Sequence, residues 1–299
     1  MSSFSRWIPF LLIPILLGPA HAESRVDCSV IQSRILNQAV RYCVMLPSGY
    51  GAAVPARSAR HYPVLYFLHG LGDNEQTLFK SAGWDLIEDL RQQGKISDFL
   101  IVTPDGMRSF YINSADERVR YSDFFVREFI PYIESHYSIR RERSARAISG
   151  ASMGGYGALR FAFAYPDLFS SVSAESAALI AELPRPSESS HSGSALSGLM
   201  GTVFGEPVDV PHWKQNSPFI LAKQNRRQIR TASLSIYFNC GNEDDFGFDA
   251  GAMQLHRLLE AESIPHEFHL YPGSHGAEYF LSHLGETLIF HSRAFAATK

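Results

Sequence analysis

The chain has 299 residues, of which 45% are hydrophobic and 19% are charged, and its formal net charge is −3. This is the composition of an ordinary globular protein, and the length suffices to bury a core without metals or several disulfides. Because positive charge is neither in excess nor gathered in a basic stripe, nucleic acid is not expected as a partner.

The first 22 residues have the pattern of an export signal. Arg6 provides a positive start, residues 7–17 form an apolar run, and Ala20-His21-Ala22 offers the small residues that signal peptidase recognises. The run is shorter than the ~20 residues that a membrane-spanning helix needs. We therefore predict a signal peptide at 1–22 rather than an uncleaved anchor, and one secreted or periplasmic domain at 23–299 without stable membrane insertion.

Short apolar runs alternate with segments of helical spacing along the rest of the chain. The expected strands are 29–33, 39–46, 64–68, 99–103, 145–149, 171–174, 234–238 and 268–271, and the expected helices are 84–93, 121–137, 156–165, 250–261 and 278–297. Such alternation indicates an α/β fold with a mostly parallel sheet flanked by helices. Ligands bind such sheets at the carboxyl ends of the strands.

The three cysteines have different surroundings. Cys28 and Cys43 flank an expected hairpin that turns near Asn37, so either a disulfide or two separate thiols fits their spacing. Cys240 follows an apolar strand, and we expect it to be a buried free thiol.

Residues 183–210 interrupt the alternation of strands and helices with a segment rich in Ser, Pro and Gly. A segment of this length is typical either of a loop on the surface or of a lid over a pocket. Both interpretations stay open. Residues 110–113, Phe110-Tyr111-Ile112-Asn113, follow the strand at 99–103, and they either line the pocket with an aromatic ring or pack beneath the loop. The pocket is the preferred interpretation.

The candidate nucleophile is Ser152, within Gly150-Ala151-Ser152-Met153-Gly154. A serine hydroxyl needs a base to remove its proton, and it must be presented on a sharp turn. Glycines two positions before and after the serine relieve the crowding of such a turn. The five residues alone are weak evidence, but an apolar strand precedes them and a helical pattern follows.

In an α/β fold with a serine nucleophile, an acid and then a histidine are expected to follow the serine along the chain, each on a loop after a strand. His275 lies in Gly273-Ser274-His275-Gly276 and would take the proton from Ser152. Glu243, Asp244 and Asp245 precede it after another strand, and the residue types alone do not choose among these three acids.

Two backbone N–H groups should stabilise the oxyanion of the reaction. One belongs to Met153, the residue after the nucleophile. The other is expected in His69-Gly70-Leu71-Gly72, after an early strand, and Leu71 N–H is the candidate. His69 itself is expected to be a buried structural residue, and this chemistry requires no cofactor and no metal.

These motifs together resemble the esterase D-like family of α/β hydrolases. The resemblance spans roughly residues 33–290 and is carried by the His-Gly-Leu-Gly-Asp run at 69–73, the Ser-Met-Gly-Gly run at 152–155, the Gly-Asn-Glu-Asp run at 241–244 and the Gly-Ser-His run at 273–275. It implies the α/β-hydrolase fold, and it implies that the acid is Asp244, three residues after Gly241. The chain departs from the family at residues 276–280, where a tryptophan-rich stretch is common.

The motifs and the resemblance together predict a serine esterase with Ser152, Asp244 and His275 as its triad, acting on small-molecule or polysaccharide-linked esters. The alternatives are a feruloyl or acetylxylan carbohydrate esterase and an acyltransferase of the mycolyltransferase type, which passes the acyl group to an alcohol. A non-catalytic binding protein on the same scaffold and a secreted peptidase are more distant rivals.

Overall fold

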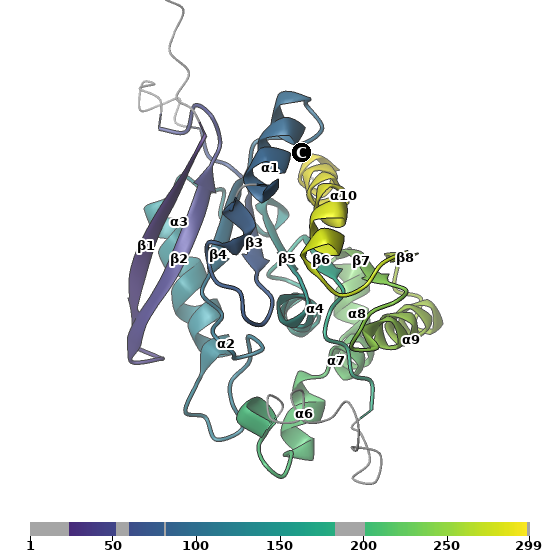
Figure 1. The fold of residues 1–299 in the computed structure, drawn as a ribbon. Coiled ribbons are helices and arrows are strands. Elements are labelled where there is room, and N and C mark those ends of the chain that lie inside the picture. The colour runs from purple at the N-terminus through teal and green to yellow at the C-terminus, as the bar shows by residue number, and fades with distance from the viewer. Residues whose placement is uncertain (1–23, 52–59, 81, 183–200, 298–299) are drawn as a thin grey trace, which may run out of the picture.

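The computed structural model describes residues 24–51, 60–80, 82–182 and 201–297 (Figure 1). The expected signal peptide lies outside these residues, as do residues 183–200 of the expected loop or lid. The strands are β1 (Arg25–Ser33), β2 (Gln38–Leu46), β3 (Val64–Leu68), β4 (Leu100–Pro104), β5 (Arg146–Gly150), β6 (Ser171–Glu175), β7 (Ser235–Gly241) and β8 (Glu267–Tyr271).

The eight strands form one sheet in the order β1-β2-β4-β3-β5-β6-β7-β8. The hairpin β1–β2 is antiparallel and adds antiparallel to β4, whereas every other pair is parallel. The expected mostly parallel sheet is therefore confirmed. Because β3, β5, β6, β7 and β8 are mutually parallel, the loops at their carboxyl ends lie along one edge of the sheet.

Helices cover both faces of this sheet (Figure 1). One face carries α2 (Tyr121–Phe124), α3 (Ile130–His136), α4 (Met153–Ala164) and α9 (Phe248–Ala261), and the other carries α1 (Ala82–Gln92) and α10 (Ala277–Ala297). Successive strand residues divide between the faces, so that Tyr66 belongs to the first core and Leu65 and Phe67 belong to the second.

The helical segments differ from expectation in two places. The helix expected at 121–137 is divided into α2, a π-helical turn η3 (Phe125–Phe129) and α3. Pro131 stands in the first turn of α3 and cannot donate the backbone hydrogen bond that a continuous helix requires. Three helices were not expected at all, namely α6 (Val210–Asn216), α7 (Pro218–Gln224) and α8 (Arg226–Thr231), because each is too short to show a clear period.

No helix within the described ranges combines the length and the apolar character that crossing a membrane requires.

A disulfide joins Cys28 to Cys43 across the hairpin β1–β2, where the two residues are direct partners in the antiparallel register. This decides between the two alternatives that the spacing left open. Cys240 in β7 is a buried free thiol, as expected. The bridge closes a segment with a sequence separation of 15 at the outer edge of the sheet.

Replacing both bridged cysteines in Cys28→Ser/Cys43→Ser should lower the free energy of unfolding by about 2–4 kcal/mol, because the unfolded chain regains the entropy that the bridge removes. Urea unfolding measures the difference. As a control, thiol titration of the unfolded, unreduced wild type should find only Cys240. Three reactive thiols before reduction would show that the bridge is absent.

Candidate active site

Ser152 stands on a strained turn between β5 and α4. Its backbone has φ 54° and ψ −115°, a conformation that L-residues rarely adopt. Three backbone hydrogen bonds hold it there: its N–H donates to Glu175 O at 2.9 Å, and its carbonyl accepts from Tyr156 N–H and Ala178 N–H, each at 3.0 Å. The side chain is thereby presented at the carboxyl edge of the sheet.

The glycines around Ser152 are required by contact with other backbone. A Cβ atom at Gly154 would lie 1.9 Å from the carbonyl oxygen of Leu68, and one at Gly150 would lie 2.3 Å from the carbonyl carbon of Gly154. No real Cβ approaches backbone so closely. The turn therefore brings the first residues of α4 against the ends of β3 and β5 in a way that only glycine permits.

Three of the expected site residues are brought into hydrogen-bond contact. His275 Nε2 lies 3.0 Å from Ser152 Oγ, and His275 Nδ1 lies 2.7 Å from Asp244 Oδ2. A carboxylate only accepts, so Nδ1 carries the proton and Nε2 is free to accept from the Ser152 hydroxyl. The side chain of Asp244 is fully buried, whereas that of His275 is 9% exposed.

The neighbouring acids are placed differently. Asp245 is exposed, and its carboxylate accepts from the backbone N–H of His275 at 3.4 Å rather than from the ring. Glu243 is also exposed. Of the three adjacent acids, only Asp244 reaches the imidazole in this structure.

The pKa of Asp244 lies below its usual value despite burial. Loss of water around the carboxyl is the largest influence and raises the pKa, but hydrogen bonding to His275 and the charge of a protonated His275 lower it. The N–H groups of Phe246 and Phe248 lower it further through bonds of 3.0 and 3.4 Å to Oδ1. Asp244 is therefore an anion held beside the imidazole at neutral pH.

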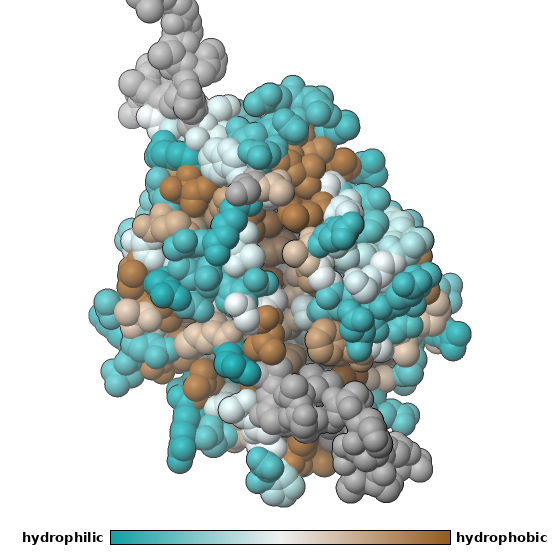
Figure 2. Space-filling model, in the orientation of Figure 1, coloured by the Kyte–Doolittle hydropathy of each residue, from teal (hydrophilic) through white to brown (hydrophobic). Residues whose placement is uncertain are grey.

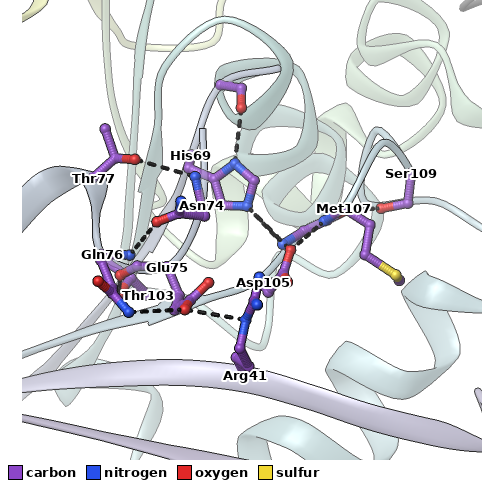
Figure 3. A network of polar contacts seen from close by, with 12 residues as sticks. Arg41, His69, Asn74, Glu75, Gln76, Thr77, Thr103, Asp105, Met107 and Ser109 are labelled. Atoms are coloured by element: carbon purple, nitrogen blue, oxygen red, sulfur yellow. Dashed lines mark hydrogen bonds and ion pairs between the residues drawn. The ribbon is translucent and has the colours of Figure 1, made fainter. Parts of the chain in front are cut away.

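His69 fixes the loop that carries Leu71 (Figure 3). It is buried, its Nδ1 lies 2.8 Å from Gly70 O, and its Nε2 lies 2.7 Å from the N–H of Gly106. Because Nε2 must accept from an N–H, the ring is neutral and Nδ1 donates to the Gly70 carbonyl. In a trans peptide the N–H points opposite to the carbonyl. The bond therefore also sets the direction of Leu71 N–H.

Gly70 lies next to Ser152, since a Cβ atom built on it would be 3.6 Å from Ser152 Cβ. Met153 N–H begins α4 on the other side of Ser152. Within the described ranges neither Leu71 N–H nor Met153 N–H donates to a protein group. Both donors therefore lie near Ser152 without an acceptor among the described residues.

A network of charges supports this loop from below (Figure 3). Arg41 on β2 contacts Glu75 at 3.2 Å and Asp105 at 2.9 Å, and Thr103 Oγ1 donates to the Glu75 carbonyl. Glu75 is buried. The network ties the loops after β3 and β4 to β2.

Phe110 and Tyr111 do not line a pocket at Ser152, contrary to expectation. Both are buried, and Tyr111 OH donates to His69 O at 3.0 Å. The φ angles of Phe110 and Tyr111, 51° and 59°, turn the chain inward here. These residues therefore pack beneath the loop that carries Leu71, which is the second of the two interpretations that the sequence left open.

A pocket of about 480 Å³ lies beside Ser152, between the ends of β3, β5 and β6 and the first turns of α10. Figure 2 shows apolar side chains gathered where α1 and α10 approach each other. The lining is mainly apolar and includes Phe67, Leu78, Ala151, Phe280, Leu281 and Leu284. Glu175 is also part of the lining although it is only 1% exposed.

Glu175 was not singled out from the sequence. Its carboxyl accepts from Thr287 Oγ1 at 2.6 Å, and burial raises its pKa to about 8, slightly opposed by that hydrogen bond. The one available signal was an acid at the end of an otherwise small and apolar strand. Such a residue costs folding free energy unless it is neutral or paired.

A second histidine contacts serines deeper in the structure. His291 lies between Ser171 Oγ and Ser173 Oγ, each at 2.8 Å, in a pattern that resembles part of a triad. All three residues have no exposed surface, and burial lowers the pKa of His291 to about 3. An ester cannot reach these serines, so the cluster joins α10 to β6 as a structural contact.

Within the described ranges, no group of three His, Cys, Asp or Glu residues is arranged to hold a metal ion.

The chain resembles known proteins in sequence. The profile of the family described as "Putative esterase" matches residues 33–291. Esterase Rv1288 of Mycobacterium tuberculosis is 32% identical over 246 residues, which cover 78% of this chain and 51% of that protein. An acetyl esterase of Caldicellulosiruptor saccharolyticus is 29% identical over 188 residues, covering 60% of this chain and 65% of that one.

Among solved structures, a ferulic acid esterase is 27% identical, with a TM-score of 0.75 and coverage of 92% of this chain and 99% of that one. The fold is therefore that of the α/β hydrolases, as the resemblance to the esterase D-like family implied. The chain spans about half the length of the Mycobacterium relative that it matches.

The raised pKa of Glu175 predicts a pH-dependent cost in stability. An unfolded glutamate loses its proton near 4.5, whereas folded Glu175 keeps its proton until about 8. Between these values the unfolded state binds fewer protons, so the folded state loses stability as pH rises. The variant Glu175→Gln should therefore gain stability relative to wild type from pH 5 to about 8, with no further gain above.

Urea unfolding at a series of pH values measures this difference. Glu243→Gln is the matched control, because Glu243 is exposed and should give a curve parallel to wild type. Parallel curves for Glu175→Gln as well would show that the carboxyl titrates normally.

Proposed function

We propose that this chain, which belongs to the esterase family whose profile it matches over residues 33–291, hydrolyses carboxylic esters through an acyl-enzyme on Ser152. The observation that supports the proposal most is the continuous contact from Ser152 Oγ through His275 to the buried Asp244. The strained turn that exposes Ser152 supplies the second requirement of a nucleophile.

In the first half-reaction, Ser152 Oγ attacks the ester carbonyl while His275 Nε2 takes its proton. The imidazolium that forms is stabilised by the Asp244 carboxylate, which keeps its negative charge. The tetrahedral intermediate then expels the alcohol, and His275 returns the proton to the leaving oxygen. The acyl group is left on Ser152.

In the second half-reaction, water takes the place of the alcohol. His275 removes a proton from the water as it attacks the acyl-enzyme, and then donates that proton to Ser152 Oγ as the acid departs. In both steps the oxyanion would accept from Leu71 N–H and Met153 N–H. One such donor is worth about 10²–10³-fold in kcat.

The alternative of a carbohydrate esterase that releases feruloyl or acetyl groups is favoured by the relatives. Two of them are named a ferulic acid esterase and an acetyl esterase. The apolar pocket beside Ser152 has room for an acyl group larger than acetyl. We propose small-molecule or polysaccharide-linked esters as the substrate class.

We also propose that residues 1–22 are removed on export and that residues 23–299 act as one secreted or periplasmic domain. The disulfide Cys28–Cys43 supports this location, because such bonds persist in oxidising compartments. N-terminal sequencing of the protein from its producing cells should begin at Glu23. An intact Met1 on the exported, active protein would contradict cleavage.

Substitution within the triad should abolish turnover of nitrophenyl esters. Ser152→Ala and His275→Ala should each lower kcat by about 10⁴-fold or more, and Asp244→Asn by about 10³–10⁴-fold, because the proton transfer or the tautomer that permits it is lost. A fluorophosphonate probe should label Ser152 in wild type and leave Ser152→Ala unlabelled.

Asp245→Asn is the matched control for Asp244→Asn, since the two acids are adjacent but only Asp244 contacts the imidazole. It should change kcat by less than about threefold. A severe loss in Asp245→Asn with a mild one in Asp244→Asn would reverse the assignment. Absence of any probe adduct on wild type would overturn the esterase proposal.

A further inference from the structure

The pocket of about 480 Å³ opens at the nucleophile. Ala151 directly precedes Ser152, and Gly70 lies against it, and both residues line the pocket. At the same end, the lining residue Phe280 packs edge-on to His275 with ring centres 5.3 Å apart. An acyl group attached to Ser152 therefore has this pocket directly beside it.

The positions of residues along α10 indicate how far the pocket extends. Ala277, Phe280, Leu281 and Leu284 lie on one helical face and line the pocket, and Thr287 occupies the next turn of that face. At 1.5 Å per residue, Thr287 lies about 10 Å along the helix axis from Phe280. Because Thr287 bonds the Glu175 carboxyl and Glu175 lines the pocket, the helix geometry indicates that this carboxyl lies toward the end of the pocket remote from His275.

Glu175 brings an unpaired polar atom to that end. Its Oε1 accepts from Thr287 Oγ1, while Oε2 has no hydrogen-bond partner among the described residues. The walls around it are apolar, with Phe67 on β3 and Leu284 on α10. A carboxyl group in such a place is stable only in its neutral form unless a cation pairs with it.

The charges near Glu175 favour this neutral form. Glu286 on α10 adds a negative charge that disfavours a second anion. Asp73 and Lys80 line the pocket with opposite charges and are exposed, and the lining residue His69 is neutral because its Nε2 accepts a hydrogen bond. Burial, with a smaller contribution from the charge of Glu286, raises the pKa of Glu175 to about 8, so at neutral pH the group carries a proton.

We propose that Glu175 is a specificity-determining residue at the closed end of the acyl pocket, where its neutral carboxyl donates a hydrogen bond from Oε2 to an acceptor oxygen at the far end of the acyl group. The substrate class is thus esters of elongated, mainly apolar acids that carry an uncharged oxygen opposite the carbonyl. This inference rests on the proposed esterase function.

The residues that line the pocket determine which acyl groups it favours. An acyl group with a purely hydrocarbon end leaves the Glu175 donor unpaired when the pocket is filled, which costs binding. An acyl group ending in a carboxylate would meet Glu175 and the nearby charge of Glu286. An ether, ester or phenolic oxygen pairs with the donor without adding charge.

Two matched substrates test the inference on the full-length protein: the methyl esters of 4-methoxycinnamic acid and 4-ethylcinnamic acid, which differ in one oxygen. For wild type at pH 6.5, kcat/KM should favour the methoxy ester by about 10-fold. The variant Glu175→Met removes the donor and should bring the ratio close to one. Glu175→Gln keeps an N–H donor and should retain most of the preference.

The pH dependence of the same ratio separates recognition from a structural effect. In wild type the preference should fall as pH rises through about 8, because the carboxylate no longer donates. In Glu175→Gln it should stay constant. Any effect of pH on the catalytic step that the two substrates share cancels in the ratio.

Ser173→Ala is the control variant, since Ser173 lies on the same face of β6 below the pocket and bonds Ser149 and His291 instead. Its ratio should equal that of wild type even if its stability is lower. If Glu175→Met does not fold, the pH profiles of wild type and Glu175→Gln still test whether the Glu175 carboxyl recognises the substrate oxygen.

A wild-type ratio near one, or a pH-independent preference, would overturn the inference. So would turnover of phenyl acetate without turnover of either cinnamate. In those cases labelling of Ser152 by a fluorophosphonate and hydrolysis of phenyl acetate would leave the esterase proposal standing. If both of these are absent, the proposed function fails and the inference fails with it.

Discussion

The site depends on one backbone conformation that most residues avoid, the turn at Ser152. Its positive φ costs about 1–3 kcal/mol and persists because neighbouring strands over-determine it. Glu175 O accepts the Ser152 N–H, while Gly154 approaches Leu68 so closely that no side chain fits. Three adjacent strands, β3, β5 and β6, thus meet at Ser152, and the loop that carries Leu71 and the pocket lie where those strands end.

Two buried carboxyls near this turn have opposite protonation behaviour for a clear physical reason. Asp244 accepts from His275 and from two backbone N–H groups, and these donors outweigh its desolvation, so its pKa falls. Glu175 receives one neutral hydroxyl from Thr287 in apolar surroundings, and desolvation dominates. The first carboxyl is an anion that can orient an imidazole, whereas the second is an acid that can donate a hydrogen bond.

Much of the fold was accessible from the sequence because its signals are local. The strand expected at 64–68 is β3 as the structure has it, and the other parallel strands differ from expectation by a few residues at their ends. The turn at Ser152 was also local, since the need for glycine two positions away arises within five residues. The unexpected helices α6, α7 and α8 are too short for periodicity to reveal them.

The sequence by itself determined the order of the strands and of the longer helices, the position of the strained serine and the candidate loops for acid and base. Only the tertiary structure showed that Asp244, the acid implied by the resemblance, contacts His275, that Tyr111 packs under the loop that carries Leu71, and that Glu175 lines a pocket. The reason is that desolvation and hydrogen-bond partners depend on residues far apart in the chain. Glu175 and Thr287 are separated by 112 positions, and the sequence around either residue does not indicate its contact with the other.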